Sequence, residues 1–189
     1  MTPLDTSAAR RPALARALPS GLAAAAVVVL GALLVGGLTS LGQQYLPSWL
    51  TSLANSSGGW SLFAFLLVWL VRARPALAAV LGALAFVAMV EAYGLVSGWR
   101  GYFYAAPFSS RWTLIGLFAG PVIGVAASLA RSPRHARRIG GVAILSTVLV
   151  AEGAYGLVTL LGSTSPVYWT LEVVAGAAFL AAAIVRRRA

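Results

Sequence analysis

The chain has 189 residues, of which 60% are hydrophobic and 10% are charged. An ordinary soluble domain carries roughly 25% charged residues, so this chain has too few charges to cover a water-facing surface. The composition predicts an integral membrane protein and excludes a disordered chain and a nucleic-acid-binding domain. Because Cys is absent, disulfides, a thiol nucleophile and thiolate metal sites are excluded as well.

Six apolar segments follow one another along the chain. A membrane-crossing helix needs about 20 apolar residues, and no charged residue occurs between Arg16 and Arg72. That stretch is too long for one span, so we predict two, at about 18–41 and 58–71. The second span is short, and we expect it to extend into the uncharged residues before Trp60. Further spans are predicted at about 75–98, 112–130, 139–162 and 166–185.

The predicted fold is therefore an all-α, multi-pass bundle of six transmembrane helices in the cell membrane. The membrane domain covers 18–185, between short basic tails at 1–17 and 186–189. The apolar runs are continuous and rich in Ala, Leu and Gly, which favours helices over a closed β-barrel. The first run is longer than the hydrophobic part of a signal peptide, which predicts an uncleaved first helix.

The arginines predict the orientation of the bundle. Loop arginines collect on the cytoplasmic side of a membrane. One side of the predicted bundle receives Arg10, Arg11, Arg16, Arg72, Arg74, Arg131, Arg134, Arg137, Arg138, Arg186, Arg187 and Arg188, and the other receives Arg100 and Arg111. Both termini are therefore expected to be cytoplasmic. The basic clusters are expected to contact anionic lipid headgroups of the bilayer rather than nucleic acid.

A threefold repeat is visible in the sequence. Three tryptophans begin matching tripeptides at the start of the even-numbered spans, Trp60-Ser61-Leu62, Trp112-Thr113-Leu114 and Trp169-Thr170-Leu171. Each is preceded by a Gly-Leu pair, and two of these pairs lie in the matching runs Ala92–Val96 and Ala154–Val158. Although tryptophan is common at membrane interfaces, that preference does not explain the matched neighbours. The pattern predicts three hairpins of the same orientation, at about 19–74, 75–131 and 139–188.

The fourth predicted span carries a face of small residues. Gly116, Gly120 and Gly124 recur every four residues, and such faces allow helices to approach closely. This face could pack within the bundle, or it could hold a protein partner or a second copy of the chain. Pro121 lies in the same helix and can kink it, so a hinge is the alternative to a tight contact.

Three of the four acidic residues lie within predicted spans: Glu91, Glu152 and Glu172. A charge at the centre of a bilayer costs at least about 2.5–3.5 kcal/mol, so such residues are rarely without a role. The helical rise places all three roughly 9–15 Å below the outer ends of their helices. Each acid shares a helix face with small or polar neighbours three or four positions away, which suits the bundle interior. These neighbours include Ala88 and Gly94 for Glu91, Tyr155 and Gly156 for Glu152, and Tyr168 and Gly176 for Glu172.

Two interpretations of these carboxylates remain open. In the first, Glu91, Glu152 and Glu172 converge near Tyr93 or Tyr155, line an outward-facing cavity and bind a cation or carry protons. In the second, each carboxylate is structural and bonds to its own polar neighbours. The aromatic loop 99–111 is expected above the same outer face, either as a lid over the cavity or as a segment in the membrane interface.

The sequence contains no pattern typical of a catalytic or cofactor site. His135, the one histidine, lies among arginines in a predicted loop. We find no metal-binding cluster, phosphate-binding glycine loop or Ser-His-Asp set, and no nucleophile beside a base. The sequence therefore predicts a protein that is not an enzyme and that needs neither a metal nor a cofactor.

The segment that links the first two spans carries a family resemblance. Residues 37–42, Leu53-Ala54-Asn55-Ser56 and Trp60 resemble an uncharacterised family of small membrane proteins common in actinobacteria. That resemblance implies a polytopic membrane fold and no particular activity. In size, helix number and the Ala-rich first helix, the chain is also similar to the substrate-binding subunits of energy-coupling-factor transporters, although the threefold repeat is a difference from them.

The function predicted from these features is a component that binds or transports a small solute in an acidic, outward-facing cavity. The alternative is a non-catalytic membrane subunit or assembly factor that holds a partner through its glycine face. The chain has no ATPase motif of its own, so transport would draw energy from a partner or from a proton gradient.

The predicted orientation can be tested by cysteine labelling in intact cells. Single cysteines replacing Ser57 and Ser163 should react with a membrane-impermeant reagent added from outside, because both lie on the side with few arginines. A cysteine replacing Ser132 should react only after permeabilisation. Labelling of the Ser132→Cys variant in intact cells would reverse the orientation.

Overall fold

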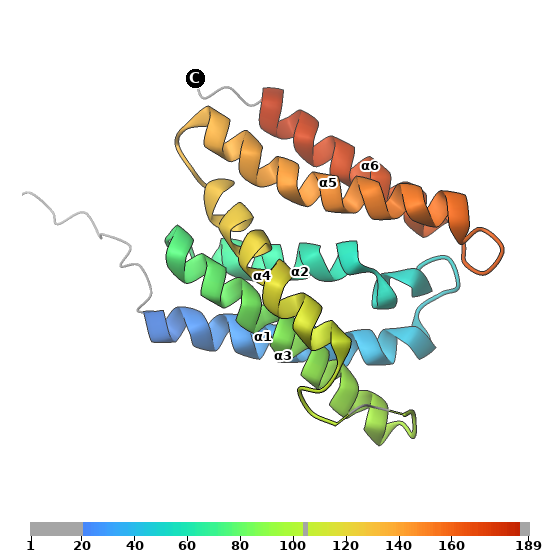
Figure 1. Ribbon diagram of the computed structural model, residues 1–189. Coiled ribbons are helices and arrows are strands. Elements are labelled where there is room, and N and C mark those ends of the chain that lie inside the picture. The colour runs from blue at the N-terminus through green and yellow to red at the C-terminus, as the bar shows by residue number, and fades with distance from the viewer. Residues whose placement is uncertain (1–20, 104–105, 186–189) are drawn as a thin grey trace, which may run out of the picture.

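The computed structural model describes residues 21–103 and 106–185 (Figure 1). The predicted basic tails, the first residues of the first predicted span and part of the aromatic loop lie outside these described residues. Within the described part the chain forms α1 (Gly21–Tyr45), the 3-10 helix η1 (Thr51–Asn55), α2 (Ser57–Leu70), α3 (Pro75–Trp99), α4 (Arg111–Leu129), α5 (His135–Thr159) and α6 (Pro166–Val185). The all-helical fold predicted from the sequence is confirmed.

Five of these helices are long and apolar enough to cross a membrane, and α2 is shorter. Its 14 residues extend about 21 Å, whereas the hydrocarbon core of a bilayer is about 30 Å thick. The second span was expected to extend through the residues before Trp60. Instead, α2 begins three residues before this tryptophan, and the preceding residues form η1, which is separated from α2 by Ser56. The polar sequence around Ser56 thus interrupts the helix, so that α2 begins only at Ser57.

Prolines and one left-handed turn set the helix boundaries. Pro75 and Pro166 are the first residues of α3 and α6, where the missing N–H has no intrahelical partner to lose. Arg72 has a φ of 57°, and this left-handed residue helps the chain reverse between α2 and α3. Pro121 lies inside α4, and the helix continues on both sides of it.

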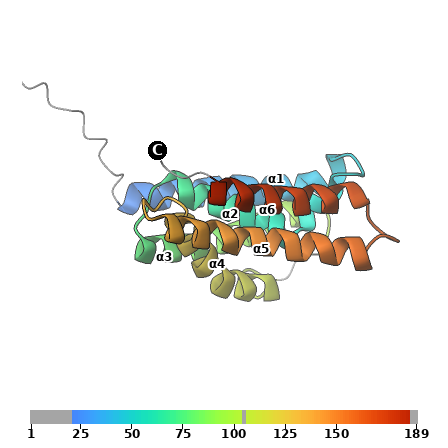
Figure 2. The same cartoon turned by 90° about the horizontal axis from the view of Figure 1, so that it is seen from above.

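The short helix α2 lies at the centre of the arrangement. Figures 1 and 2 show the α5–α6 pair on one side of α2 and the α1–α3 pair on the other, with α4 crossing between them. The closest packing joins α3 to α4, α1 to α3 and α5 to α6, whereas α2 contacts α1, α3, α4 and α5. Anything that fixes the position of α2 therefore affects both halves of the bundle.

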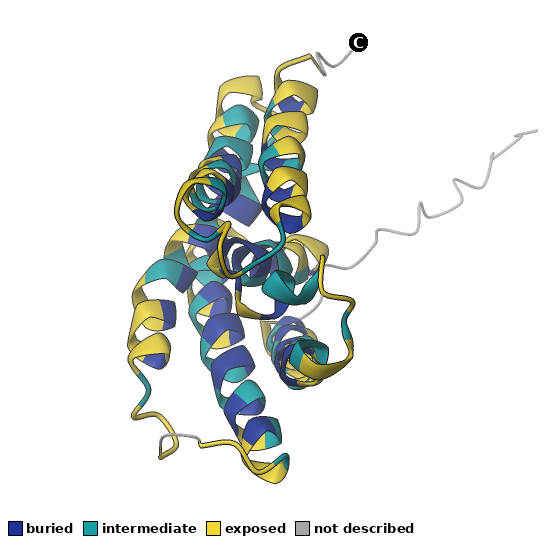
Figure 3. Ribbon diagram, turned by 90° about the vertical axis from the view of Figure 1, so that its right-hand side faces the viewer, coloured by how far each residue is buried: buried dark blue, intermediate teal, exposed yellow. Residues whose placement is uncertain are grey.

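The core is built from small and medium apolar side chains. Val28 in α1, Val68 in α2, Leu81 and Met89 in α3, and Leu149 in α5 are almost completely buried. Figure 3 shows the buried positions facing neighbouring helices, with exposed positions on the outer faces. Many exposed side chains are large and apolar, as expected of helices that contact lipid rather than water.

The glycine face of α4 packs inside the chain. A methyl group added to Gly120 or Gly124 would overlap backbone atoms of Gly82, Ala83 or Ala78 in α3, and one added to Gly116 would press against Phe86. All three α4 glycines are buried. The face considered above as a possible partner surface is therefore occupied by α3, and it permits two backbones to come into direct contact.

The three matching tryptophans occupy comparable places in the chain but different surroundings. Each lies in the first turn of its even-numbered helix. Trp169 is 4% exposed and Trp112 is 52% exposed, while Trp60 is half-buried and packs its ring against Tyr93. The helices of the second and third hairpins pack closely, whereas α1 packs mainly against α3 rather than α2. The threefold symmetric arrangement stays a prediction.

The described arginines separate between the two ends of the bundle. Because successive helices alternate in direction (Figure 1), Arg72, Arg74 and the α4–α5 loop lie at one end, and Arg100 and Arg111 lie at the other. Arg131 donates to the carbonyl of Trp69 at 3.0 Å and lies over its ring, so it completes the last turn of α2. Burial, with a contribution from nearby Arg72, lowers the pKa of Arg131 from its ordinary value.

The close contact between α3 and α4 predicts opposite effects for two Gly→Ala substitutions. Gly124→Ala should lower the free energy of unfolding by about 1–3 kcal/mol, because the methyl group overlaps the α3 backbone. Gly140→Ala should be neutral or stabilising by about 0.5–1 kcal/mol, since nothing lies within 4 Å of the added methyl group. Thermal unfolding of both variants in detergent measures the difference. Equal stability would contradict the packing described here.

Candidate functional site

The candidate site is built around Ser56, the residue that begins α2. Ser56 is fully buried and extended (φ −85°, ψ 127°), and its side chain accepts a hydrogen bond from the backbone N–H of Gly59 at 2.9 Å. This is the usual role of a serine N-cap. The surrounding sequence, Asn55-Ser56-Ser57-Gly58-Gly59, contains residues that favour caps and turns over a continuous helix.

Glu152 of α5 satisfies the first backbone N–H groups of α2. Its Oε1 accepts from the N–H of Ser57 at 2.8 Å, and its Oε2 accepts from the N–H of Gly58. Ser56 Oγ also lies 2.9 Å from Glu152 Oε2. The first N–H groups of a helix have no intrahelical acceptor, and the helix dipole favours negative charge at this end. The carboxylate of one helix therefore caps another.

Glu172 of α6 reaches the same serine from the protein interior. Its side chain is 5% exposed, and its Oε1 lies 3.0 Å from Ser56 Oγ and 3.2 Å from the hydroxyl of Tyr168. Its other oxygen, Oε2, is buried and has no hydrogen-bond partner. We call Ser56, Glu152, Glu172 and Tyr168 the serine–glutamate cluster.

The absence of a side chain at Gly58 makes room for this cluster. A methyl group at Gly58 would overlap the carboxylate oxygens of both Glu172 and Glu152. The two acids thus come close together against the backbone of α2, and a glycine is required where they do so. The cluster joins α2 to both helices of the α5–α6 hairpin.

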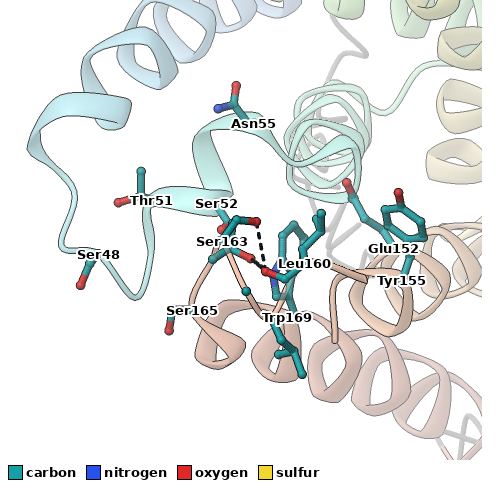
Figure 4. A pocket seen from close by; sticks show the side chains of 13 residues that line it. Ser48, Thr51, Ser52, Asn55, Glu152, Tyr155, Leu160, Ser163, Ser165 and Trp169 are labelled. Atoms are coloured by element: carbon teal, nitrogen blue, oxygen red, sulfur yellow. Dashed lines mark hydrogen bonds between the residues drawn. The ribbon is translucent and has the colours of Figure 1, made fainter. Parts of the chain in front are cut away.

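A cavity of about 540 Å³ opens beside the cluster (Figure 4). Glu152 and Tyr155 of α5 line one side of it, and Trp169 of α6 contributes an aromatic surface. The other lining residues are Ser48, Thr51, Ser52, Asn55, Leu160, Leu161, Gly162, Ser163, Thr164 and Ser165. In the described part of the chain, the lining therefore combines hydroxyl groups and one amide with one acidic side chain, Glu152.

Glu91 has other partners. Its Oε1 accepts from Thr113 Oγ1 at 2.8 Å, and its Oε2 accepts from the backbone N–H of Phe108 at 3.1 Å. Thr113 lies in the first turn of α4, so Glu91 holds the start of that helix and the loop before it. The predicted convergence of three acids is therefore met by Glu152 and Glu172 but not by Glu91.

The two predicted tyrosines are also separated. Tyr155 lines the cavity with Glu152. The hydroxyl of Tyr93 accepts from Gln43 at 2.7 Å, and its ring packs edge-on against Trp60. Tyr93 thus belongs to the contact between α1, α2 and α3.

The aromatic loop does not contribute to the cavity lining in its described part. Arg100 donates to Ser40 and to Gln44 Oε1, the latter at 2.9 Å, and lies 5.0 Å from the ring of Tyr102. Together with the contact between Phe108 and Glu91, this fixes the loop to α1 and α3. The arrangement does not support the interpretation of this loop as a lid over Glu152.

The sequence interpretation missed Ser56 and Tyr168 as members of the site. The residues around Ser56 favour a turn, but the pairing of that turn with α5 and α6 depends on contacts about 100 positions away along the chain. The signal that could have found Tyr168 is its position four residues before Glu172, which places both side chains on one face of α6. Within the described residues, no group of three or more His, Asp or Glu side chains is arranged to hold a metal ion.

Comparison with known proteins identifies the family. A model described as "Family of unknown function (DUF6518)" matches residues 15–189. The chain belongs to DUF6518. Comparisons with curated proteins and with solved structures gave no match. Membership of DUF6518 confirms the resemblance to an uncharacterised family, and it assigns no activity to the serine–glutamate cluster.

Two serine N-caps provide a matched test of the cluster in this DUF6518 chain. Ser110 caps α4 by accepting from the N–H of Trp112 at 3.2 Å, and Ser56 caps α2. Ser110→Ala should lower the free energy of unfolding by about 0.5–2 kcal/mol. Ser56→Ala should lower it further, because both carboxylates also lose a buried hydrogen-bond partner. Thermal unfolding in detergent compares the two variants, and a smaller loss for Ser56→Ala would contradict the described cluster.

Proposed function

We propose that this chain is a non-catalytic component of the cell membrane that binds a small polar solute, as a receptor or transport subunit. The binding site is the cavity lined by Glu152, and the arginine-rich end of the bundle faces the cytoplasm. The observation that carries the proposal is the double role of Glu152, whose carboxylate both lines the cavity and holds the N-terminus of α2.

The size and lining of the cavity support the proposal. Cavities that bind small molecules commonly measure about 300–1,000 Å³ and place a few polar groups on a partly apolar wall. This cavity of about 540 Å³ has hydroxyl groups, the amide of Asn55 and the carboxylate of Glu152, together with the rings of Tyr155 and Trp169. Such a lining offers hydrogen bonds from several directions and one charge.

The short length of α2 supports a position within the membrane for this site. A helix of about 21 Å whose C-terminal end lies at the arginine-rich side has its N-terminal end inside a hydrocarbon core about 30 Å thick. Non-helical backbone at such a depth is tolerated where it is covered by protein or lines a water-filled cavity. The segment from Ser48 to Asn55 lines the cavity. Interrupted helices of this kind contribute to solute sites in many transporters.

The contacts of Glu152 provide a route from binding to conformational change. A solute that bonds to Glu152 competes with the N–H groups of Ser57 and Gly58 for the same carboxylate oxygens. Because α2 contacts four other helices, a change at its first turn alters the packing of the bundle. A ligand can shift a conformational equilibrium only through such a difference in contacts between two states.

A thermal-unfolding screen tests the proposed binding. The full chain in phospholipid nanodiscs is heated with a panel of small polar solutes, including amines, amino acids, polyols and amides. A solute that binds the folded state raises the unfolding free energy by about 2.7 kcal/mol at 100 times its Kd. We expect at least one class of solute to stabilise the chain.

A cavity-filling variant localises any effect found in the screen. Ser52→Trp fills the cavity and should abolish stabilisation by the solute, whereas Thr170→Trp places the same side chain at an exposed position of α6 outside the lining and should leave it unchanged. Equal stabilisation of both variants would contradict the proposed site. Stabilisation by lipid or a protein partner, with none by solutes, would favour the membrane-subunit alternative.

A further inference from the structure

We infer that Glu172, Ser56 and Glu152 form a proton relay that holds one exchangeable proton, and that a small cation entering the cavity displaces this proton. The proton-binding part rests on the serine–glutamate cluster alone. The exchange with a cation rests in addition on the proposed function of the cavity.

The hydrogen-bond inventory of Ser56 carries the inference. A serine hydroxyl has one hydrogen to donate and two lone pairs to accept with. Ser56 Oγ accepts from the N–H of Gly59 and lies within 3.0 Å of an oxygen of each glutamate. Its single hydrogen can make a full, well-aligned hydrogen bond to only one of the two carboxyl groups, because a hydrogen shared between both oxygens bonds each of them more weakly. A full hydrogen bond at the second contact requires that carboxyl group to be protonated and to donate to the serine.

The contacts of the two glutamates identify which one carries the proton. Both oxygens of Glu152 accept from backbone N–H groups at the start of α2, as an ionised carboxylate does. Glu172 makes no such backbone contact among its hydrogen bonds, is 5% exposed, and has an oxygen with no partner. An ionised carboxylate in that position would leave a charge buried and incompletely bonded. The neutral, protonated acid is therefore Glu172.

These assignments give a continuous chain of donors and acceptors. The hydroxyl of protonated Glu172 donates to Ser56 Oγ, and Ser56 donates to Glu152 Oε2. Tyr168 donates to Glu172 Oε1, the same oxygen that contacts Ser56. Only Glu152 of these groups lines the cavity. This series of hydrogen bonds thus connects a buried acid, Glu172, with Glu152, which is accessible from the cavity.

Proton transfer along this series of hydrogen bonds conserves every hydrogen. The O–H bond of Glu172 breaks as its proton moves to Ser56, and the original hydrogen of Ser56 moves to Glu152. From Glu152 the proton leaves to water in the cavity. Both glutamates are then ionised, and the arriving cation restores the earlier net charge of the site. Exchange of one cation for one proton therefore leaves the net charge of the site unchanged.

The other titratable groups of the packed helices are engaged elsewhere. Neither η1 nor α2 contains a titratable side chain. Arg111 at the start of α4 lies over the ring of Trp112, and Tyr155 of α5 lines the cavity. On α3, Glu91 bonds to Thr113 and Tyr93 bonds to Gln43. The titratable group that contacts Glu152 or Glu172, apart from these two acids, is thus Tyr168.

A cation is the ligand class that the cavity favours. Among the described residues that line the cavity, Glu152 provides the single formal charge, and none is an arginine or a histidine. The hydroxyl groups of the lining can accept hydrogen bonds from an ammonium group, whereas the side-chain carbonyl of Asn55 already accepts from Gln43 at 2.6 Å. The rings of Tyr155 and Trp169 offer aromatic surfaces that attract cations. A small organic ammonium ion therefore matches both the charge and the hydrogen-bonding groups.

Infrared spectroscopy tests the stored proton without any ligand. The full chain in nanodiscs should show, near neutral pH, the carbonyl band of a buried protonated carboxylic acid, and the band should shift in D₂O. Glu172→Gln should remove it, whereas Glu91→Gln should not. Absence of the band from the unmodified chain, or its loss in Glu91→Gln with retention in Glu172→Gln, would overturn the inference.

Proton release tests the exchange, with methylammonium chloride as the probe and acetamide as a neutral control of similar size. In weak buffer with a pH indicator, methylammonium should release about one proton per chain and reduce the infrared band of the unmodified protein, while acetamide should do neither. Glu152→Gln and Glu172→Gln should abolish the release. The measurement on the unmodified chain remains decisive even if these variants fail to fold.

The outcomes separate this inference from the proposed function. Stabilisation by methylammonium without proton release would overturn the exchange and leave solute binding in place. Stabilisation by acetamide alone would overturn the choice of a cation and also leave solute binding in place. Failure of every solute in the screen would overturn both the proposed function and the exchange.

Discussion

Buried polar groups in a membrane bundle must find their partners within the protein, and α2 shows how this chain meets that requirement. A helix leaves its first N–H groups without acceptors, and carboxyl groups inside a bundle need donors. Here the unpaired N–H groups and the carboxylate bond to each other, because Glu152 accepts from the N–H groups of Ser57 and Gly58. Glu91 plays a related part at the start of α4 through Phe108 and Thr113. Intramembrane acids and early helix starts are therefore parts of one arrangement.

This solution depends on small residues at the places where polar or backbone atoms meet. Gly58 admits the two carboxylates, and Gly156 leaves space against which the ring of Trp169 packs. In α4 the glycines allow direct contact with the backbone of α3. Helices in a bilayer gain little from hydrophobic burial against one another, so close packing and hydrogen bonds contribute most of their association. The abundance of Gly and Ala is thus as important to the fold as the apolar character of the chain.

Much of the fold could be predicted from the sequence because it depends on local properties. Apolar length located the spans from Pro75 to Val185, and prolines and arginines marked their ends. The start of α2 was harder to predict. Its polar residues favour a turn, but a break within a long uncharged stretch has no periodic signal of its own. The stability of this break depends on contacts with α5 and α6.

The candidate site was predictable in its chemistry but not in its pairing. The cost of placing an acid in a membrane identified Glu91, Glu152 and Glu172, and the helical rise placed them at similar depths. Depth along a helix does not determine which helices are neighbours. Glu91 lies on α3, which packs against α1 and α4, whereas the other two acids lie on the adjacent helices α5 and α6. Similar depth therefore brought two of the three together.

The unequal lengths of the helices have a consequence for how the chain fits bilayers of different thickness. Helices α1, α3 and α5 have 25 residues each and extend about 37 Å, which exceeds the hydrocarbon thickness and favours tilt. The shorter α2 lies among the other helices, and its large exposed side chains, Leu66, Trp69 and Leu70, lie toward its C-terminal end, so only that end has to match the lipid. A thicker or thinner bilayer is thus accommodated by the tilt of the long outer helices. Through Ser56 that tilt acts on the α5–α6 hairpin, which links hydrophobic mismatch to the geometry of the serine–glutamate cluster.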